Sequence, residues 1–481
     1  MDKKRVDILF VQNYYERYIG IMSISAVLKK YNFITDVIIG EVDYILKKII
    51  ETNPKVIGFH CTTGFHHRNI NIAAAIKKIY GNKVITIFGG PHPTFVPSMI
   101  KEKGVDIICR GEGEFAVLEL MQALRDGLEY NKIKNLSVKM NGRIYENELR
   151  SLCNVNDLPH PDREIYKNIK YTYKNKKQEI LVSRGCPFNC SFCSAHAFRN
   201  LYKKNGNYVR VRSIPNVIDE LERIKNNYKP SCFLFYDETF NLQYDYCFEF
   251  LNEYRKKINI PFGCLIKADL VTESFVKLLK ESGCHNAQFG IESGNEKIRN
   301  MLFKKDISEE KILKCGQLLH KYKIPFITFN MVGAPGETLS QVWDTVNLNI
   351  KVKPAWARFS SCQPLPGTEL AEYSLEHGYL SDIDIKLSDA TYLERSIILN
   401  KHVQGKKIIR LKNIANLVIK IPILKSFAKI MLYIPLDLVY RIMDKLFFYI
   451  CYQTKNTYKM SFYEVVYMAF FYLRRRKEFD F

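Results

Sequence analysis

Three cysteines stand close together near the middle of the chain, and their spacing predicts a metal cluster. Cys186, Cys190 and Cys193 are separated by three residues and then by two, directly after an apolar strand-like run at 179–182. Three thiolates on one loop can hold iron, whereas four would close an ordinary iron–sulfur site. With three protein ligands, one iron of the cluster stays open and can bind another molecule. We therefore expect an iron–sulfur cluster with one reactive iron.

Zinc and a purely structural role are the alternatives for these cysteines. Structural zinc takes a fourth Cys or His at defined spacing. His196 is the only nearby candidate, and its position three residues after Cys193 is a poor match. Unmodified cysteines are also common in protein cores. The rest of the chain favours the cluster.

The spacing, with Phe192 just before the last cysteine, resembles the cluster loop of the radical S-adenosylmethionine (SAM) enzymes. The resemblance implies that Cys186, Cys190 and Cys193 are catalytic and ligate a [4Fe–4S] cluster, with Phe192 beside the cofactor. It implies that the open iron chelates the amino and carboxylate groups of SAM. It further implies reductive cleavage of SAM to methionine and a 5′-deoxyadenosyl radical, which abstracts hydrogen from an unactivated carbon.

Residues 175–375 are predicted to form a barrel-like domain. Strand-like runs lie at 232–236, 261–267, 286–291, 324–331 and 357–363, with helix-like stretches between them. Together with the strand before Cys186 they make six strand–helix units, which agrees with the partial (β/α)6 barrel that the radical SAM resemblance implies. In such barrels the chemistry lies at the carboxyl ends of the strands.

Polar or glycine residues follow four of these strands and are the candidate SAM contacts. They are Asp237, Glu238, Lys267, Glu292, Ser293 and Gly333. From the family, we expect the two acids after the first of these strands to hold the SAM ammonium and the lysine to pair with its carboxylate. The next pair is expected near the ribose or methionine, and the glycine near the adenine. Taken singly, each could instead be a helix cap, a turn or a surface ion pair.

Residues 1–150 are predicted to form a doubly wound, Rossmann-like α/β domain. Strand-like runs lie at 5–11, 55–60, 84–88 and 105–109, and helix-like stretches at 20–30, 44–51, 69–80, 95–103 and 114–125. This alternation indicates a parallel sheet whose ligands lie at the carboxyl ends of the strands.

The residues at those strand ends resemble the cobalamin-binding domain that precedes the radical SAM domain in one large enzyme class. The candidate cobalamin contacts are Thr62, Thr63, Gly89, Gly90, His92, Gly111 and Glu112. The Asp-x-His-x-x-Gly motif, which supplies a histidine to cobalt in many cobalamin proteins, is absent. The alternative is a degenerate domain that only packs against the catalytic one.

A linker at 151–174 and a basic, aromatic, mostly helical region at 376–481 complete the predicted organisation. From residue 401 onward there are sixteen Lys or Arg against five Asp or Glu, about half of the net charge of +22. Uncharged runs at 446–454 and 465–473 are too short for a spanning helix. The region is expected either to pack as a helical cap or to lie on a membrane surface. The Arg474–Lys477 run is expected to be a solvated terminus.

The composition of the chain indicates its cellular compartment and which partners to expect. The 13 cysteines are mostly scattered singly in apolar segments, which favours a reducing cytoplasm over a disulfide framework. The start of the chain is predicted to be a first strand and not a signal peptide. No nucleic-acid-binding module is recognisable, so we expect no nucleic-acid partner.

The leading hypothesis is a cobalamin-dependent radical SAM C-methyltransferase that acts on a natural product or lipid-like substrate. It implies an external one-electron donor such as flavodoxin or ferredoxin, methyl delivery from methylcobalamin, and a second SAM that remethylates the cofactor. The second hypothesis is a radical cyclase or rearrangement enzyme of the anaerobic magnesium-protoporphyrin ester cyclase kind. A non-catalytic iron–sulfur or membrane-surface scaffold is the third. A transfer-RNA methylthiotransferase fits less well, because no second cysteine trio precedes Cys186.

Overall fold

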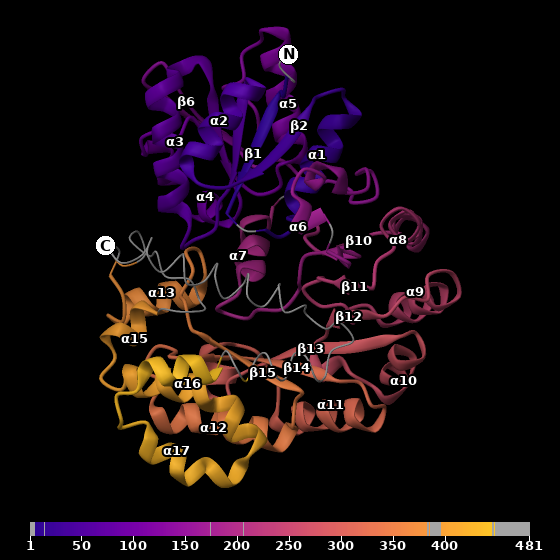
Figure 1. Ribbon diagram of the computed structural model, residues 1–481, viewed down its shortest axis with the longest axis vertical. Helices are drawn as coiled ribbons and strands as arrows, with labels where there is room; N and C mark the ends of the chain where they lie inside the picture. Colours follow the sequence, from indigo (N-terminus) through magenta and orange to yellow (C-terminus); the bar gives the residue numbers. More distant parts are fainter. Residues whose placement is uncertain are drawn as a thin grey trace. The chain divides into compact units, whose positions relative to one another are not determined.

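The structure is a computed structural model that describes residues 5–13, 15–173, 175–204, 206–381, 384, 396–444 and 447. The chain divides into two compact units, each treated by itself below. The first comprises Met1–Lys229 and Gln363–Thr391, and the second comprises Pro230–Cys362 and Tyr392–Phe481 (Figure 1).

The first unit is built on a seven-stranded sheet in the order β2-β1-β3-β4-β5-β6-β7. Its strands are β1 (Ile8–Gln12), β2 (Thr35–Ile39), β3 (Val56–His60), β4 (Ile85–Gly89), β5 (Ile107–Cys109), β6 (Leu136–Met140) and β7 (Arg143–Glu146). The first five are parallel, whereas β6 and β7 add an antiparallel edge. Chain order reverses beside β1, where ligands of doubly wound sheets bind.

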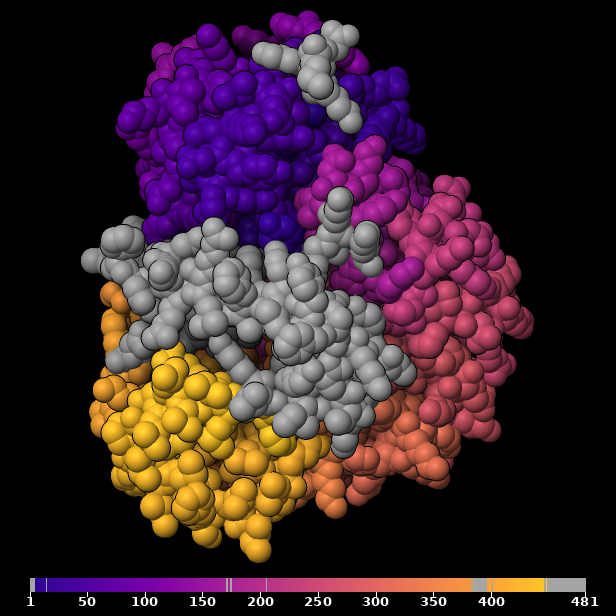
Figure 2. Space-filling view, viewed as in Figure 1, coloured from indigo at the N-terminus to yellow at the C-terminus, as the bar shows by residue number. Residues whose placement is uncertain are grey.

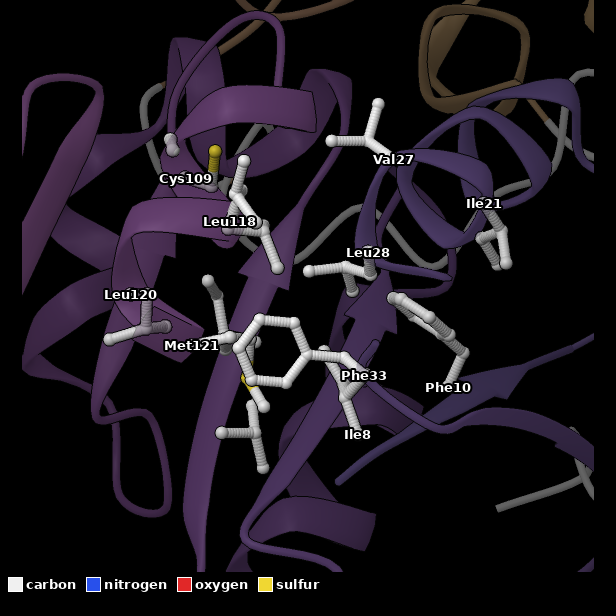
Figure 3. Packing of buried hydrophobic residues seen from close by; sticks show 14 of the residues in the cluster. Ile8, Phe10, Ile21, Val27, Leu28, Phe33, Cys109, Leu118, Leu120 and Met121 are labelled. Carbon is white, nitrogen blue, oxygen red and sulfur yellow. The ribbon is translucent and has the colours of Figure 1, made fainter. Parts of the chain in front are cut away.

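Helices cover both faces of this sheet because side chains of successive strand residues alternate between the faces. They are α1 (Ile19–Lys30), α2 (Val42–Thr52), α3 (His66–Tyr80), η1 (Gly81–Lys83), α4 (Pro91–Phe95), η2 (Pro97–Lys101) and α5 (Glu114–Asp126). Ile8 and Phe10 of β1 pack with α1 and α5, as Figure 3 shows. Leu9 and Val11 face the other way and pack with α2 and α3. The two cores hold the strand ends in place.

The predicted doubly wound fold is confirmed, with four departures in detail. Strands β2, β6 and β7 were not predicted from the sequence. The single helix predicted over 95–103 is wrong, because α4 ends at Phe95 and a separate 3-10 turn begins at Pro97. A proline lacks the backbone N–H that a continuing α-helix needs.

The rest of the first unit carries the cysteine loop and its supports. Its elements are η3 (Arg163–Tyr166), α6 (Lys170–Tyr173), β8 (Lys177–Ile180), β9 (Ser183–Arg184), α7 (Ser194–Leu201), β10 (Arg210–Val211), α8 (Ile214–Tyr228) and α13 (Glu369–Glu376). The segment between the sheet and β8 is firmly packed. Tyr166 is buried and donates a hydrogen bond to Gln12 Oε1 at 2.7 Å, and Arg163 forms a buried ion pair with Glu220 at 2.8 Å.

The second unit alternates parallel strands with helices, as expected for a partial α/β barrel. Its strands, in the order β15-β14-β13-β12-β11, are β11 (Cys232–Phe235), β12 (Phe262–Leu265), β13 (Cys284–Glu292), β14 (Phe326–Val332) and β15 (Trp356–Ser361). The connecting helices are α9 (Tyr244–Lys257), η4 (Ala268–Leu270), α10 (Glu273–Glu281), η5 (Lys297–Leu302), α11 (Glu309–Lys321) and α12 (Leu339–Val352). Each predicted strand of this unit is present within a few residues of its expected bounds.

The last described helices are α15 (Ile397–Lys401), α16 (Gly405–Lys420), η6 (Pro422–Leu424) and α17 (Lys425–Met431). α16 packs on α12 and β15 through a continuous apolar cluster. Asn416 of α16 donates to the Ala357 carbonyl at 2.8 Å and accepts from the Ala357 N–H at 3.0 Å. These bonds pair the backbone N–H and carbonyl of Ala357 on the outer edge of β15. The uncharged runs at 446–454 and 465–473 and the Arg474–Lys477 run lie outside the described residues. Within the described part, no helix is long and apolar enough to cross a membrane.

Candidate active site

The cysteine loop connects β9 to α7 and contains little regular structure. Cys193 is the N-cap residue of α7, and its N–H donates to the Cys190 carbonyl at 3.1 Å. Gly185, just before the loop, has φ +93°, and a Cβ there would lie 2.4 Å from the Tyr208 carbonyl oxygen. The loop is therefore entered through a turn that only glycine can make.

The three loop cysteines differ from the other described cysteines in their exposure. Cys186, Cys190 and Cys193 are partly exposed, whereas eight of the remaining nine are buried. Burial raises the pKa of thiols such as Cys61 and Cys247 to about 12, which keeps them protonated. Accessible thiols with this spacing are the donor set that suits an iron–sulfur cluster.

The loop is assigned from this donor set and not from converged sulfur atoms. Among the described residues, no three His, Cys, Asp or Glu side chains are arranged so that they could hold a metal ion. His196, the sequence candidate for a fourth zinc ligand, is buried on α7. Its Nδ1 lies 3.9 Å from Glu369 Oε1, and its Nε2 lies 3.2 Å from Asn200 Nδ2.

Arg199 of α7 holds the loop backbone, and this contact was not predicted from the sequence. Its guanidinium donates to the carbonyls of Cys186 at 3.5 Å and Phe188 at 3.3 Å, and also to the Pro187 carbonyl. It further donates to Asn189 Oδ1. One planar cation thus fixes four successive residues, which shapes the loop between the first two cysteines.

The candidate SAM contacts lie at the carboxyl ends of adjacent parallel strands in the second unit. Asp237, after β11, is fully buried, while Glu238 is exposed. Lys267, after β12, places Nζ 2.5 Å from Asp269 Oδ2. Because β11 and β12 are neighbours, these charges lie at one edge of the sheet.

The end of β13 carries a residue with a strained backbone and, next to it, a buried serine. Glu292 ends β13 with φ +64° and pairs with Lys305 Nζ at 3.0 Å. Ser293 is fully buried, and its hydroxyl accepts the Asn295 N–H at 3.2 Å. A non-glycine residue at positive φ is often held so at a functional site.

Gly333 follows β14 at φ +80°, and its N–H donates to Glu337 Oε2 at 2.6 Å. Burial raises the pKa of Glu337 to about 7, although the Ala334 and Gly333 N–H groups lower it in part. Lys305 and Glu337 were absent from the predicted contacts, because neither directly follows a strand.

Five of the seven candidate cobalamin contacts lie at the carboxyl ends of β3 and β4. Thr63 Oγ1 is 3.0 Å from His92 Nδ1, and the His92 ring stacks on His66 with a 3.9 Å centroid separation. Burial, helped by the nearby charges of His66 and His67, lowers the pKa of His92 to about 3. His92 is therefore neutral near pH 7. Thr62, next to this pair, is partly exposed.

Gly89 and Gly90 continue the same edge. The Cys61 N–H donates to the Gly89 carbonyl at 2.8 Å, and the His92 N–H donates to the Cys61 carbonyl at 3.2 Å. Gly90 has φ +109°, and a Cβ there would lie 2.8 Å from the Cys61 carbonyl oxygen. The close approach of these two loops needs a residue without a side chain.

Gly111 and Glu112, after β5, contact the segment around the cysteine loop. The Gly111 N–H donates to Thr94 Oγ1 at 3.1 Å, and the Glu112 N–H donates to the Tyr202 hydroxyl at 3.3 Å. The Glu112 carboxylate accepts from Arg210 Nη2 at 2.6 Å and from Arg184 Nη1 at 3.0 Å. Its role as a cobalamin contact stays a prediction.

The sequence of this chain matches two family profiles and is similar to several known proteins. The B12 binding domain profile matches residues 7–121, and the Radical SAM superfamily profile matches residues 180–348. An uncharacterized methyltransferase of Pyrococcus horikoshii is 30% identical over 350 residues, covering 72% of this chain and 74% of that protein. The chain belongs to the radical SAM enzymes with a cobalamin-binding domain.

Two further relatives carry the names of different activities. The cytidylyl-2-hydroxyethylphosphonate methyltransferase of Streptomyces wedmorensis is 22% identical over 77% of this chain and 75% of its own. The anaerobic magnesium-protoporphyrin IX monomethyl ester cyclase of Rubrivivax gelatinosus is 25% identical over 68% of this chain and 60% of its own.

The fold is also that of a solved cobalamin-dependent radical SAM enzyme. The structure of OxsB with aqua-cobalamin and SAM bound superposes with a TM-score of 0.68, covers 98% of this chain and 75% of OxsB, and is 15% identical.

Membership of this family sets the cofactors. A radical SAM domain works with a [4Fe–4S] cluster and SAM, and a B12-binding domain binds cobalamin. The predicted family, fold class and cofactors are confirmed. The individual cofactor contacts stay predictions.

Proposed function

We propose that this radical SAM enzyme transfers a methyl group to an unactivated carbon of a natural product or lipid-like substrate. The observation that carries the proposal is the combination, in one chain, of the cysteine loop and a cobalamin-binding fold. The name of the Pyrococcus relative, a methyltransferase covered over 74% of its length, supports it.

In this proposal each group of residues has a separate task. Cys186, Cys190 and Cys193 hold the cluster and Arg199 shapes their loop, with Phe192 as an apolar shield that limits water. When bound, the cluster supplies the electron that cleaves SAM, and cobalamin supplies a methyl carrier.

The second unit would bind SAM through the residues at its strand ends. These are Asp237, Glu238, Lys267, Glu292, Ser293 and Gly333. The acids suit the SAM ammonium and the lysine suits its carboxylate, because charge-assisted hydrogen bonds are stronger than neutral ones. Glu337 orients the Gly333 backbone through its 2.6 Å hydrogen bond.

The first sheet would bind cobalamin along one edge. The proposed contacts are Thr62, Thr63, Gly89, Gly90, His92 and Gly111. Glu112 is left out of this set because Arg184 and Arg210 already bind its carboxylate. Neutral His92 would act as a hydrogen-bonding and packing group without adding charge to the site. The proposed domains are 1–150 for cobalamin, 151–174 as a linker, 175–375 as the barrel and 376–481 as a helical region.

Cyclisation or rearrangement is the second candidate, and the Rubrivivax cyclase relative favours it. The two candidates differ in the products formed from SAM. A methyltransferase that receives its methyl group from SAM releases S-adenosylhomocysteine in addition to 5′-deoxyadenosine, whereas a cyclase releases none. We expect anaerobic reconstituted protein with SAM and titanium(III) citrate to form S-adenosylhomocysteine in at least one equivalent per bound cobalamin. Formation of 5′-deoxyadenosine without S-adenosylhomocysteine would favour cyclisation or rearrangement over methyl transfer.

Cluster binding without any SAM product would instead favour the non-catalytic scaffold.

The proposed setting is a reducing cytoplasm, which the buried thiols suit. The proposed electron source is an external one-electron donor such as flavodoxin or ferredoxin.

We also propose that the C-terminal region contacts a membrane surface through residues 421–442. Ile423, Ile430 and Tyr433 are 87%, 65% and 68% exposed, while Ala428 and Leu432 are buried in the apolar cluster that α16 forms with α12 and β15. Figure 2 shows the described part of this region, in yellow, at the molecular surface. One side of the segment therefore joins the core, and the other presents apolar side chains to solvent.

The positive charge of this region favours an anionic lipid surface as its partner. From residue 401 to 441 there are nine Lys or Arg against one Asp. Lysines near exposed apolar groups are attracted to acidic headgroups while the apolar groups enter the interface.

Replacing Ile423 and Phe427 together by serine should weaken binding to phosphatidylglycerol vesicles about tenfold, because less apolar surface is buried in the lipid. Co-sedimentation measures it. Ile79→Ser, which removes a 61%-exposed isoleucine of the first unit, is the matched control and should bind normally. Wild-type protein that fails to sediment with these vesicles at low salt would contradict the proposal.

A further inference from the structure

Two arginines stand at the base of the cysteine loop, one on each side of it. Arg184 belongs to β9, two residues before Cys186, and Arg210 belongs to β10, after α7. The two strands pair antiparallel with Arg184 opposite Arg210. The cluster loop and α7 are therefore a connection that begins and ends at this arginine pair.

Both arginines bind one carboxylate of the cobalamin-binding domain. Glu112 Oε1 accepts from Arg210 Nη2 at 2.6 Å and from Arg184 Nη1 at 3.0 Å, while Oε2 accepts from Arg210 Nη1 at 3.0 Å. The carboxylate thus bridges β9 and β10. Contacts of this kind fix orientation because the guanidinium is planar.

A second carboxylate from the same turn binds Arg184 from another direction. Glu114 Oε1 accepts from Arg184 Nη2 at 2.7 Å and from the Ser23 hydroxyl at 2.7 Å. Its side chain is only 5% exposed. Two carboxylates therefore face two guanidinium groups, and the charges balance.

The backbone of the turn is fixed against the far end of the loop connection. The Tyr202 hydroxyl, just after α7, accepts the Glu112 N–H at 3.3 Å. Gly111 has φ +75°, and a Cβ there would lie 1.7 Å from the Tyr202 hydroxyl oxygen. The turn after β5 and the loop connection cannot shift independently without breaking these contacts.

We propose that Glu112 and Glu114 are positioning residues for the iron–sulfur cluster: they hold the β9–β10 base from which Cys186, Cys190 and Cys193 are presented. This inference rests on the proposed role of those cysteines as cluster ligands. It assigns Glu112 a task directed at the cluster, where the sequence had suggested a contact to cobalamin. It also makes the turn after β5 a physical link between the two cofactor sites.

Glu112→Gln tests the inference, because it keeps the size of the side chain and removes its charge. After anaerobic reconstitution of the full chain with iron, sulfide and hydroxocobalamin, we expect iron per chain to fall at least threefold, or the electron paramagnetic resonance spectrum of the reduced cluster to change. Cobalamin retained through gel filtration should stay within twofold of wild type. Glu119→Gln is the matched control, since Glu119 pairs with Arg150 on the outer side of the same helix and should leave both readouts unchanged.

Charge balance supplies a second variant. In Glu112→Gln/Arg210→Gln one charge of each sign is removed, so its iron content should exceed that of Glu112→Gln alone. Glu114→Gln, which leaves the Glu112 contacts in place, gives the same test if Glu112→Gln does not yield folded protein. We expect Glu114→Gln to change the spectrum of the reduced cluster as well.

Three results would overturn the inference. Loss of cobalamin with an unchanged cluster would make Glu112 a cobalamin contact. Wild-type cluster content and spectrum in both single variants would remove any positioning role. Wild-type protein that binds no cluster would overturn the cluster assignment itself, which separates failure of the proposed function from failure of this inference.

Discussion

Replacing Cys190 by alanine should abolish the formation of 5′-deoxyadenosine. In this variant only Cys186 and Cys193 would hold the cluster. Among the described residues none replaces the lost ligand, since His196 is buried and lies beside Glu369 and Asn200. Changes to groups that only orient ligands cost about 10–100-fold in metal affinity or activity. Loss of a ligand should therefore exceed a hundredfold, as measured by chromatography of the nucleoside product, with iron per chain falling in parallel.

The matched control for this variant is Cys315→Ala. Cys315 is buried on α11, and burial keeps its thiol protonated by raising its pKa well above the ordinary value. Removing one sulfur from a helix core should cost about 1 kcal/mol of unfolding free energy and leave the cluster intact. Normal nucleoside formation by Cys190→Ala, or equal loss in both variants, would remove the special role of the loop cysteine.

Replacing Gly90 by alanine should prevent cobalamin from being retained. The residue has φ +109°, and the added methyl group would meet the Cys61 carbonyl at 2.8 Å. Strain of this kind costs on the order of 1–3 kcal/mol, and relief requires the loops after β3 and β4 to separate. Those loops carry Thr63 and His92, so the site should be distorted. Visible absorption after gel filtration measures the retained cobalamin, which we expect to fall at least tenfold.

Gly127→Ala separates this effect from backbone strain alone. Gly127 follows α5 at φ +69°, and its added methyl group would meet no atom within 4 Å. The variant should lose about 1 kcal/mol of unfolding free energy and keep its cobalamin. Full retention by Gly90→Ala would mean that the Gly89–Gly90 turn is not part of the cobalamin site.

Much of the fold follows from local pattern, and the exceptions have physical reasons. Buried parallel strands such as β3 and β4 are continuous apolar runs, which the sequence marks clearly. β7 lies at the sheet edge with mostly exposed side chains, so it has no apolar run to detect. β2 has Asp36 within a five-residue strand, which hides its buried residues.

The site could be predicted only where chain geometry dictates proximity. Successive parallel strands end at one edge, which brings Asp237 and Lys267 to a common side of the sheet. No comparable rule predicts which ion pairs form between segments that are far apart in the sequence. Glu112 and Arg210 are 98 residues apart, and no spacing in the sequence joins them. The turn after β5 could therefore be located, but its arginine partners could not.

The most direct test of the central claim is the fate of SAM. Wild-type protein, reconstituted anaerobically with iron and sulfide and given SAM and titanium(III) citrate, should form methionine and 5′-deoxyadenosine in equal amounts. Omission of the reductant should stop both. Protein that carries a full complement of iron and sulfide yet forms no 5′-deoxyadenosine would contradict the assignment of radical SAM chemistry to this chain.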